Sequence, residues 1–330
     1  MHALIIEKPG EISIVEKDIP EISENQVLIK TKAVALNHRD QFIREGKYPA
    51  IRYGVTLGAD ACGEVIQIGN NANQNWLNKT VIINPNVNWG SDPKVQAHDY
   101  HILGTPTDGV FSEYIAIDAQ KIIEKPTHLT LEQAAALPLA GMTAFRALFH
   151  HAKLEENEKI LITGIGGGVA QFVFQFALAA KAEVYITSGA SEKRNKCLEM
   201  GAKAAFNYKQ EDWLKKAKSE AHGFDVVIDS AGGSALNNII KLMNPAGRIV
   251  CYGATTGKVE ELDLFRIFWN QITLQGSTMA NDEEFKQMVE FVNTHKIRPI
   301  IDSVVKFDNI MNQFNRMRDG KQFGKLVAEF

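Results

Sequence analysis

The sequence predicts an α/β protein that combines a doubly wound parallel sheet domain with a β-rich, barrel-like domain. Three observations predict this class. A strand, a glycine turn, a long helix and a second strand follow one another over residues 160–194, near the middle of the chain. The residues before this pattern are rich in strand signals, and those after it alternate strand and helix to about residue 280. We therefore expect domains at 1–137 and 138–280, with a return segment at 281–330.

The first part reads as short strands separated by turn residues, with few helical patterns. The expected strands are Met1–Glu7, Ile12–Lys17, Gln26–Asn37, Gly58–Gly69, Asn78–Asn84, Val110–Ile117 and Lys121–Lys125. Between two of them, residues 84–109 form a polar lobe without clear periodicity. Strands this short, divided this often by turns, favour a barrel-like domain.

The pattern changes at Thr130, a typical helix N-cap, and the helix that follows is interrupted at Pro138. Buried parallel strands are then expected at Ile160–Thr163, Glu183–Ser188, Phe224–Ser230, Arg248–Gly253 and Ile272–Met279. The helices between them are expected at Val169–Lys181, Lys193–Met200, Trp213–Ala221 and Ser234–Leu242. The last fifty residues, with helices at Asp282–Thr294 and Asp308–Asp319 and strands at Asp302–Phe307 and Gly324–Phe330, should complete the first domain.

Composition excludes several classes of function. The formal net charge of −3 over 330 residues argues against a nucleic-acid partner. The three cysteines are scattered and form neither a disulfide framework nor a metal-binding pair. The N-terminal segment is too short and too charged for a signal peptide, and no apolar run reaches the ~18 residues that span a bilayer. We expect a soluble cytoplasmic enzyme that acts on a small molecule, without a membrane partner.

The glycine turn predicts a dinucleotide site. Four glycines lie between Thr163 and Val169, where a strand ends and a helix begins. A glycine-rich turn lets the backbone approach a phosphate, and the helix N-terminus offers free N–H groups to that anion. The usual G-x-G-x-x-G pattern is incomplete here, so a turn without a ligand is the alternative. We expect the pyrophosphate to face Gly166, Gly167, Gly168 and Val169.

The residues after the second strand favour NADPH over NADH. A site for NAD usually has an acid there, which binds the ribose 2′-hydroxyl. This chain instead has a hydroxyl at Ser188 and cations at Lys193 and Arg194, with Glu192 as the only acid. Hydroxyl groups and cations suit a 2′-phosphate. The alternative is that the two cations belong to a solvated helix face.

Several motifs in order give the chain a resemblance to a known family over essentially its whole length. They are the glycine turn, Gly58–Gly69, the run Asp108-Gly109-Val110-Phe111-Ser112-Glu113-Tyr114, the run Leu137-Pro138-Leu139-Ala140-Gly141-Met142-Thr143-Ala144, and Gly320-Lys321-Gln322-Phe323-Gly324-Lys325. With them the chain resembles the medium-chain dehydrogenase/reductase superfamily. The resemblance implies a GroES-like barrel, a Rossmann domain, and a homodimer or homotetramer assembled through an exposed strand edge of the nucleotide domain.

Within that superfamily the zinc-binding positions are altered. Zinc alcohol dehydrogenases carry Cys-His-x-Asp and Gly-His-Glu, where this chain has Asn37-His38-Arg39-Asp40 and Gly58-Ala59-Asp60. The lobe at 84–109 also lacks the cysteines of a structural zinc site. We therefore expect no metal. The pattern is similar to the zinc-less quinone reductase and enoyl reductase branch, except that Phe42 stands where that branch often has tyrosine.

These observations predict an NADPH-dependent, zinc-independent oxidoreductase that delivers hydride to quinones or activated alkenes, the latter being α,β-unsaturated carbonyls. Asn37 and Tyr48 are the expected catalytic residues, although each could be merely structural. Further cofactor contacts, from sheet topology or from the resemblance, are expected at Thr143, Tyr208, Ser230, Tyr252, Gly253, Ala254 and Lys325. Two alternatives stay open, namely an NADP(H) alcohol or aldehyde dehydrogenase with or without zinc, and a non-catalytic NADPH-binding protein.

Overall fold

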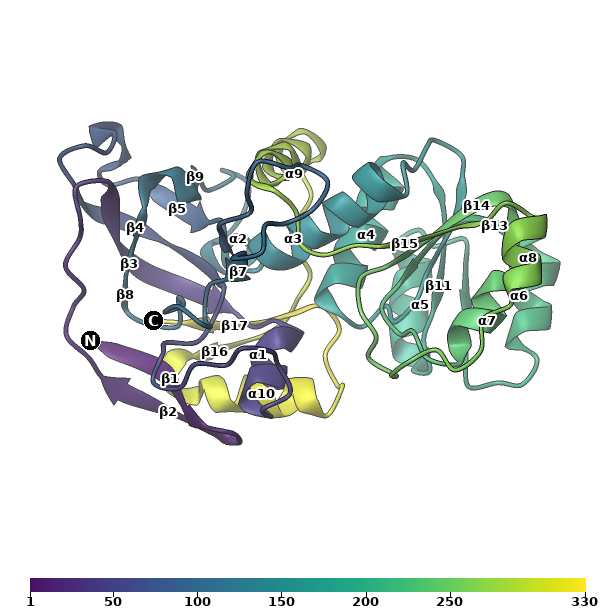
Figure 1. The fold of residues 1–330 in the computed structure, drawn as a ribbon, viewed down its shortest axis with the longest axis horizontal. Coiled ribbons are helices and arrows are strands. Elements are labelled where there is room, and N and C mark those ends of the chain that lie inside the picture. Colours follow the sequence, from purple (N-terminus) through teal and green to yellow (C-terminus); the bar gives the residue numbers. More distant parts are fainter. The chain divides into compact units, whose positions relative to one another are not determined.

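A computed structural model describes residues 1–330, and in it the chain divides into two compact units. Unit 1 consists of Met1–Ala140 and Asn281–Phe330, and unit 2 consists of Gly141–Ala280. In Figure 1, unit 1 contains the purple and blue strands together with the yellow C-terminal segment, and unit 2 is teal and green. The predicted fold class is confirmed, because one unit holds a parallel sheet and the other a largely antiparallel one.

Unit 2 is built on a six-stranded parallel sheet in the order β12-β11-β10-β13-β14-β15. Its strands are β10 (Lys159–Ile162), β11 (Glu183–Thr187), β12 (Ala204–Phe206), β13 (Phe224–Asp229), β14 (Met243–Cys251) and β15 (Thr273–Gly276). All six strands run parallel, and successive strands are added outward on one side from β10 to β12 and on the other side from β13 to β15. The sheet is therefore doubly wound, with its switch point between β10 and β13. The sequence predicts no strand at β12, whose three residues are too few to show a periodic pattern.

Helices join these strands, and their apolar residues are buried. They are α4 (Gly168–Ala179), α5 (Ser191–Glu199), α6 (Trp213–Ala221), α7 (Ala235–Ile240) and α8 (Leu264–Trp269). Helix α3 (Pro138–Phe145) leads into this unit and continues as a π-helix, η3 (Arg146–His151). Helix α4 buries Phe172, Phe174 and Phe176 almost completely, which accounts for the apolar residues of the helix predicted at Val169–Lys181.

Unit 1 contains a seven-stranded sheet in the order β16-β17-β3-β4-β5-β9, with β8 also paired to β3. Its strands are β3 (Gln26–Ala35), β4 (Asp60–Ile68), β5 (Thr80–Ile83), β8 (Tyr114–Asp118), β9 (Ile122–Glu124), β16 (Ile301–Lys306) and β17 (Lys325–Glu329). Two small sheets pair β1 (His2–Lys8) with β2 (Glu11–Glu16), and β6 (Asn86–Val87) with β7 (His101–Ile102).

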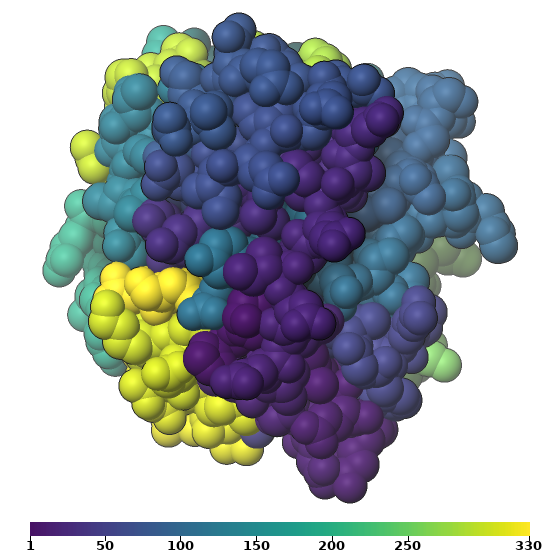
Figure 2. Space-filling view, turned by 90° about the vertical axis from the view of Figure 1, so that its left-hand side faces the viewer, coloured from purple at the N-terminus to yellow at the C-terminus, as the bar shows by residue number.

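Strand β17 brings the end of the chain into the sheet of unit 1. It pairs antiparallel with β3, with Val327 opposite Ala35, and parallel with β16. Figure 2 shows C-terminal residues in yellow at the surface next to N-terminal residues in purple. Unit 1 also contains the helices α1 (His38–Arg44), α2 (Leu131–Ala135), α9 (Asp282–His295) and α10 (Ile310–Arg318), and the 3-10 helices η1 (Gln74–Trp76), η2 (Ala119–Lys121) and η4 (Phe307–Asn309).

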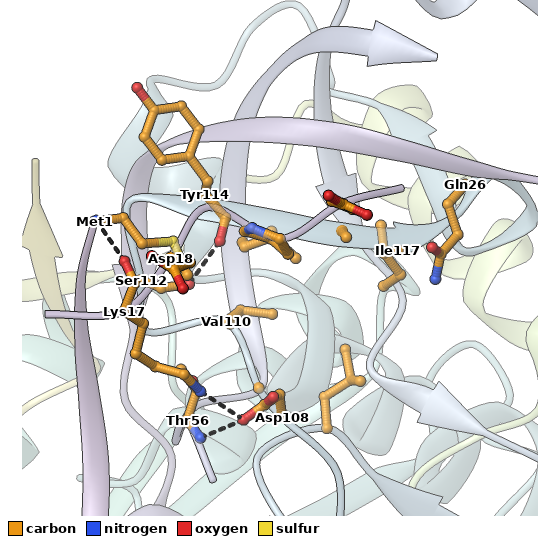
Figure 3. Close-up of a pocket in the computed structure, with 16 residues that line it drawn as sticks. Met1, Lys17, Asp18, Gln26, Thr56, Asp108, Val110, Ser112, Tyr114 and Ile117 are labelled. Atoms are coloured by element: carbon orange, nitrogen blue, oxygen red, sulfur yellow. Dashed lines mark hydrogen bonds and ion pairs between the residues drawn. The ribbon is translucent and has the colours of Figure 1, made fainter. Parts of the chain in front are cut away.

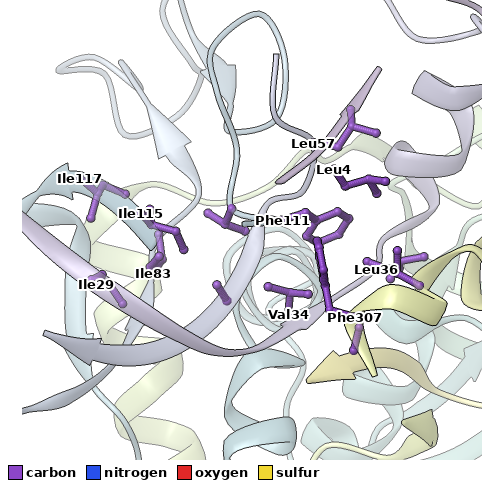
Figure 4. Close-up of a cluster of buried hydrophobic side chains, with 14 of the residues drawn as sticks. Leu4, Ile29, Val34, Leu36, Leu57, Ile83, Phe111, Ile115, Ile117 and Phe307 are labelled. Atoms are coloured by element: carbon purple, nitrogen blue, oxygen red, sulfur yellow. The ribbon is translucent and has the colours of Figure 1, made fainter. Parts of the chain in front are cut away.

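The core of unit 1 surrounds the fully buried ring of Phe111 (Figure 4). This ring packs edge-on against Phe314 of α10, and it lies directly over Gly58. A Cβ atom on Gly58 would lie 2.1 Å from the Phe111 ring, and the φ angle of Gly58 is +91°. Only glycine combines that backbone conformation with so close a contact.

The predicted strand at Val110–Ile117 is shorter in the structure, because β8 begins only at Tyr114. The backbone N–H groups of Val110 and Phe111 donate instead to carbonyl groups of Gly58 and Leu57. Packing of this loop against the Gly58 segment therefore overrides its strand-like sequence. No helix of the chain is both long enough and apolar enough to cross a membrane.

Candidate active site

Asn37 lies at the junction between β3 and α1, as the N-cap residue of α1. The Asp40 carboxylate accepts a hydrogen bond from the Asn37 backbone N–H, with Oδ2 and N 2.8 Å apart. A carboxylate three residues after an N-cap asparagine is a helix-start signal present in the sequence, yet no helix was predicted at 38–44. The bond fixes the backbone of Asn37 and leaves its amide side chain for other contacts.

The amide of Asn37 belongs to a buried network with Asp60 and Lys325. Its Nδ2 donates to Asp60 Oδ2 over 2.9 Å, while Lys325 Nζ donates to Asn37 Oδ1 over 2.7 Å and to Asp60 Oδ2 over 2.9 Å. Exposed fractions are 7% for Asn37, 0% for Asp60 and 3% for Lys325. Burial strengthens charge-assisted hydrogen bonds of this kind. The structure thus connects Asn37, predicted to be catalytic, with Lys325, predicted to contact the cofactor. Asp60 contacts both side chains, and the sequence did not indicate this role.

Asp60 is also anchored to α3. Its Oδ1 accepts a hydrogen bond from the backbone N–H of Leu139, 2.8 Å away, in the first turn of that helix. A carboxylate is stabilised at a helix N-terminus by the unpaired N–H groups and the helix dipole. Asp60 therefore connects three segments that are far apart in the sequence.

Tyr48, the second predicted catalytic residue, is half-buried beneath the side chain of Arg39. The Arg39 guanidinium carbon lies 4.9 Å from the centre of the Tyr48 ring, and Arg39 Nε approaches the phenol oxygen to 3.5 Å. Arg39 also donates to the carbonyl of Leu103 over 2.7 Å. No hydrogen bond joins Tyr48 directly to Asn37, Asp60 or Lys325; the connection runs through Arg39, whose guanidinium lies 3.6 Å from Asp40 Oδ1.

Asp40 and His38, two titratable groups at the start of α1, have shifted pKa values. Burial raises the pKa of Asp40 to about 6, and the nearby Arg39 guanidinium opposes this rise. Part of the His38 side chain is exposed to solvent. Desolvation by the surrounding protein lowers the pKa of His38 from its ordinary value of 6.5, and the nearby Lys325 ammonium lowers this pKa further. His38 is therefore mostly neutral near pH 7, and the fixed positive charge of this corner resides on Lys325 and Arg39.

The residues at this corner do not fit a divalent metal ion. Ala59 supplies no ligand atom, and the Lys325 ammonium contacts the Asn37 and Asp60 oxygens that could otherwise have been ligands. No group of three or more His, Cys, Asp or Glu side chains is arranged to hold a metal. A zinc site needs about four such donors, three of them from the protein in a catalytic site.

In unit 2, the glycine turn fits the pyrophosphate of a dinucleotide. The turn follows β10, Gly167 caps α4, and Gly166, Gly167, Gly168 and Val169 are all partly exposed. A Cβ atom on Gly167 would have only one neighbour within 4 Å, the Gly164 carbonyl oxygen at 3.7 Å. The space over the turn is therefore open, and the first N–H groups of α4 have no partner within the helix.

A buried aspartate organises the switch point next to this turn. Asp229, at the end of β13, accepts hydrogen bonds from Thr163 Oγ1 at 2.6 Å and from the Gly232 N–H at 2.8 Å. Ser230 N in turn donates to Thr163 Oγ1 over 3.2 Å. The sequence indicated Ser230 but neither Thr163 nor Asp229. Their pairing depends on the parallel contact between β10 and β13, which has no local signal.

The other predicted contacts at this edge lie near Ser230. Burial raises the pKa of Tyr252, and a hydrogen bond with Ser230 opposes that rise, so the phenol remains protonated. A Cβ atom on Gly253 would lie 3.1 Å from the Ser230 carbonyl oxygen, and Gly253 and Ala254 are exposed. The hydroxyl of Thr143, another predicted contact, donates to the Met279 sulfur over 3.7 Å.

At the end of β11, two of the predicted 2′-phosphate residues, Ser188 and Arg194, are in contact. Ser188 Oγ accepts from the Ala190 N–H over 3.2 Å, and Arg194 donates to the Ser188 carbonyl over 2.8 Å. Tyr208 is half exposed. The structure adds Lys209, whose side chain lies over Gly189, with Nζ 3.3 Å from the position that a Cβ would occupy. The sequence gave no signal for Lys209, because it is brought there by the pairing of β11 with β12.

A cavity of about 300 Å³ lies elsewhere in unit 1, beneath the connection between β2 and β3 (Figure 3). Part of its polar lining is paired: Lys17 Nζ lies 3.3 Å from Asp108 Oδ1, which also accepts from the Thr56 N–H at 2.6 Å. None of the predicted site residues lines this cavity, so we do not place the reaction there.

Two family models match the chain. Residues 23–127 match a model described as the alcohol dehydrogenase GroES-like domain, and residues 168–294 match one described as zinc-binding dehydrogenase. The first match includes Asn37 and Ala59. The second lies outside those positions, so its description does not bear on the metal ligands of this chain.

Proteins similar to the chain over nearly its whole length carry different names. A zinc-type alcohol dehydrogenase-like protein of Leptosphaeria maculans is 37% identical, over 97% of this chain and 94% of that protein. A quinone oxidoreductase of Salmonella typhimurium is 25% identical, over 97% and 92%. A crystal structure described as an NAD-dependent alcohol dehydrogenase superposes with a TM-score of 0.94 at 27% identity, covering both chains completely.

Proposed function

Because the chain belongs to the medium-chain dehydrogenase/reductase superfamily and is an oxidoreductase, we propose that it is an NADPH-dependent, zinc-independent reductase of quinones or activated alkenes. One observation carries this proposal: a buried ammonium, Lys325, bonded to Asn37 and Asp60 at the corner where zinc enzymes of the superfamily bind metal. The quinone oxidoreductase relative supports the same substrate class.

The corner suits a conjugated acceptor. NADPH, when bound, supplies a hydride, and a quinone or enone spreads the incoming charge until it reaches an oxygen. The protein then needs hydrogen-bond donors that are already aimed at this developing oxyanion. One N–H of the Asn37 side-chain amide donates to Asp60. The second N–H is left to donate to the substrate oxygen. Tyr48, stacked under Arg39, offers an aromatic face to a flat substrate.

The end of β11 supports NADPH as the cofactor. Lys193 and Arg194 lie at the start of α5, Lys209 lies over Gly189, and Arg194 is oriented by the Ser188 carbonyl. Three cations around one strand end suit the double negative charge of a 2′-phosphate better than a ribose hydroxyl.

Replacing Lys209 by methionine is expected to raise the KM for NADPH ~10-fold while leaving the KM for NADH unchanged. The reason is that one charge-assisted contact to the 2′-phosphate is lost, at roughly 1.5 kcal/mol. Steady-state kinetics with both cofactors measure this change. Lys216→Met is the matched control, because Lys216 pairs with Asp212 on the surface of α6. An equal loss with both cofactors would remove Lys209 from 2′-phosphate recognition.

A screen of NADPH oxidation over quinones, enones, enoyl thioesters and aldehydes tests the function. We expect turnover with the conjugated acceptors, faster with NADPH than with NADH, and unaffected by a chelator. Turnover confined to simple aldehydes or alcohols and lost with chelator would instead establish an alcohol dehydrogenase. Tight NADPH binding without turnover on the whole panel would establish a non-catalytic binding protein.

We also propose that the chain forms a homodimer or homotetramer through β15 and α8. Strand β15 is the terminal strand of its sheet, so one edge of its backbone is unpaired in the chain. Leu264, Phe265, Phe268 and Trp269 of the neighbouring α8 are between 62% and 70% exposed. An apolar patch of this size beside an open strand edge marks an association surface, and a two-fold axis would pair β15 with its own copy.

Replacing Phe265 and Phe268 together by serine is expected to shift the mass in solution from a multiple of 36.6 kDa to that single value. Both rings are stacked or packed edge-on within the α8 cluster, so their loss removes two of its four exposed apolar side chains. Light scattering coupled to size exclusion measures the change, with Leu77→Ser, an exposed apolar position of unit 1, as the control. A double variant that keeps the parent mass would show that the subunits meet elsewhere.

A further inference from the structure

We propose that Lys325 and Asp60 form a fixed ion pair that orients the Asn37 amide toward the oxygen of the hydride acceptor. Lys325 is then a positioning residue, which acts through Asn37, and not a cofactor contact as the sequence led us to expect. This inference rests on the proposed function and names a determinant of the same site.

The network determines which way the Asn37 amide faces. Its oxygen lies 2.7 Å from the Lys325 ammonium, and its nitrogen lies 2.9 Å from the Asp60 carboxylate. In the flipped orientation the amide N–H groups would face an ammonium and the amide oxygen would face a carboxylate, so both contacts would be repulsive. The charges of Lys325 and Asp60 therefore select a single orientation, with the nitrogen on the Asp60 side.

Asn37, Asp60 and Lys325 are each fixed in place by a hydrogen bond that involves a backbone N–H group. Asp60 accepts from the Leu139 N–H over 2.8 Å, the Asn37 N–H donates to Asp40, and the Lys325 N–H donates to the Ile300 carbonyl over 2.9 Å. At exposed fractions of 7% or less, water cannot compete for these bonds. The amide is thus already in place before a substrate arrives.

Preorganisation of this kind is what a developing oxyanion requires, because donors that are fixed in advance need no reorganisation during the reaction. The ammonium adds a second effect. By donating to the amide oxygen, it withdraws electron density from the nitrogen and makes the remaining N–H a stronger donor, as in other cooperative hydrogen-bond chains. Without Lys325 the amide would lose both its fixed orientation and this polarisation.

The test replaces Lys325 by methionine, which has a similar length and no charge. We expect kcat for the acceptors found in the screen to fall ~10²-fold, as for loss of one oxyanion donor. The dissociation constant of NADPH, measured by fluorescence titration, should stay within about 2-fold, since the residue acts on the acceptor side.

The chain provides a matched control in unit 1. Asn84, Lys121 and Asp282 repeat the same three residue types: Asn84 Nδ2 lies 2.6 Å from Asp282 Oδ1, and Lys121 Nζ lies 2.8 Å from Asp282 Oδ2. None of these three was assigned to the site. Lys121→Met breaks an ion pair of the same residue types that is more exposed to solvent, and we expect kcat and NADPH affinity to remain those of the parent chain.

A double variant, Lys325→Met with Asp60→Asn, separates positioning from folding, because it leaves no unpaired charge in the interior. We expect its melting temperature to return close to that of the parent chain while kcat stays ~10²-fold low. Recovery of kcat together with stability would show that the pair is merely structural and would overturn the inference.

A Lys325→Met variant with unchanged kcat and a tenfold weaker NADPH affinity would also overturn the inference. Absence of turnover in the parent chain on every acceptor would instead refute the proposed function, and this inference with it.

Discussion

Replacement of Asn37 by alanine is expected to lower kcat/KM for a quinone or an enone by ~10²–10³-fold, with NADPH affinity nearly unchanged. The variant removes the only amide of the buried network and with it the N–H group that we assign to the substrate oxygen. Initial-rate kinetics with the best acceptor of the screen, together with fluorescence titration of NADPH, measure the two quantities.

Asn84→Ala is the control for this experiment, because Asn84 makes a comparable bond to an aspartate away from the site. Its kinetics should match those of the parent chain. If Asn37→Ala turned over at the parent rate, Asn37 would have only its structural role as the N-cap of α1, and the oxyanion donor would have to be sought elsewhere.

Replacement of Gly58 by alanine is expected to lower the free energy of unfolding by roughly 3–5 kcal/mol. Two costs add: the left-handed backbone at φ +91°, and a methyl group 2.1 Å from the ring of Phe111. That ring cannot move aside, because it is fully buried and packed against Phe314. Urea unfolding followed by far-UV circular dichroism measures the difference.

Gly54→Ala separates the two costs. Gly54 has a similar φ of +82° but no atom within 4 Å of the added Cβ. Its variant should lose only the backbone part, roughly 1–2 kcal/mol. Equal losses for the two variants would mean that the Phe111 contact relaxes at little cost.

The sequence predicts best where structure depends on local chemistry. The glycine turn between β10 and α4 appears where it was expected, because turn glycines and an apolar helix act over a few residues. Helix α1 was missed because its seven residues carry little periodicity, although Asn37 and Asp40 already formed a capping pattern. Strand β12 was missed for a similar reason.

The candidate site depends on contacts that no local pattern reveals. Lys325 and Asn37 are 288 residues apart, and only the pairing of β17 with β3 brings their side chains together. The sequence indicated both residues but gave them separate roles. Lys209 and Asp229 were missed because their positions depend on which strands of the parallel sheet are neighbours.

The place of β17 in the sheet has a consequence for how the protein is made. During synthesis residues 141–280 form one continuous stretch, so unit 2 can fold on the ribosome while unit 1 is still incomplete. Lys325 is synthesised 265 residues after Asp60, whose carboxylate it contacts. At 5–20 residues per second, this interval is roughly 13–53 s. Until Lys325 has been synthesised, the Asp60 carboxylate lacks the cation that it contacts in the folded chain, so the network of Asn37, Asp60 and Lys325 cannot form before β17 does.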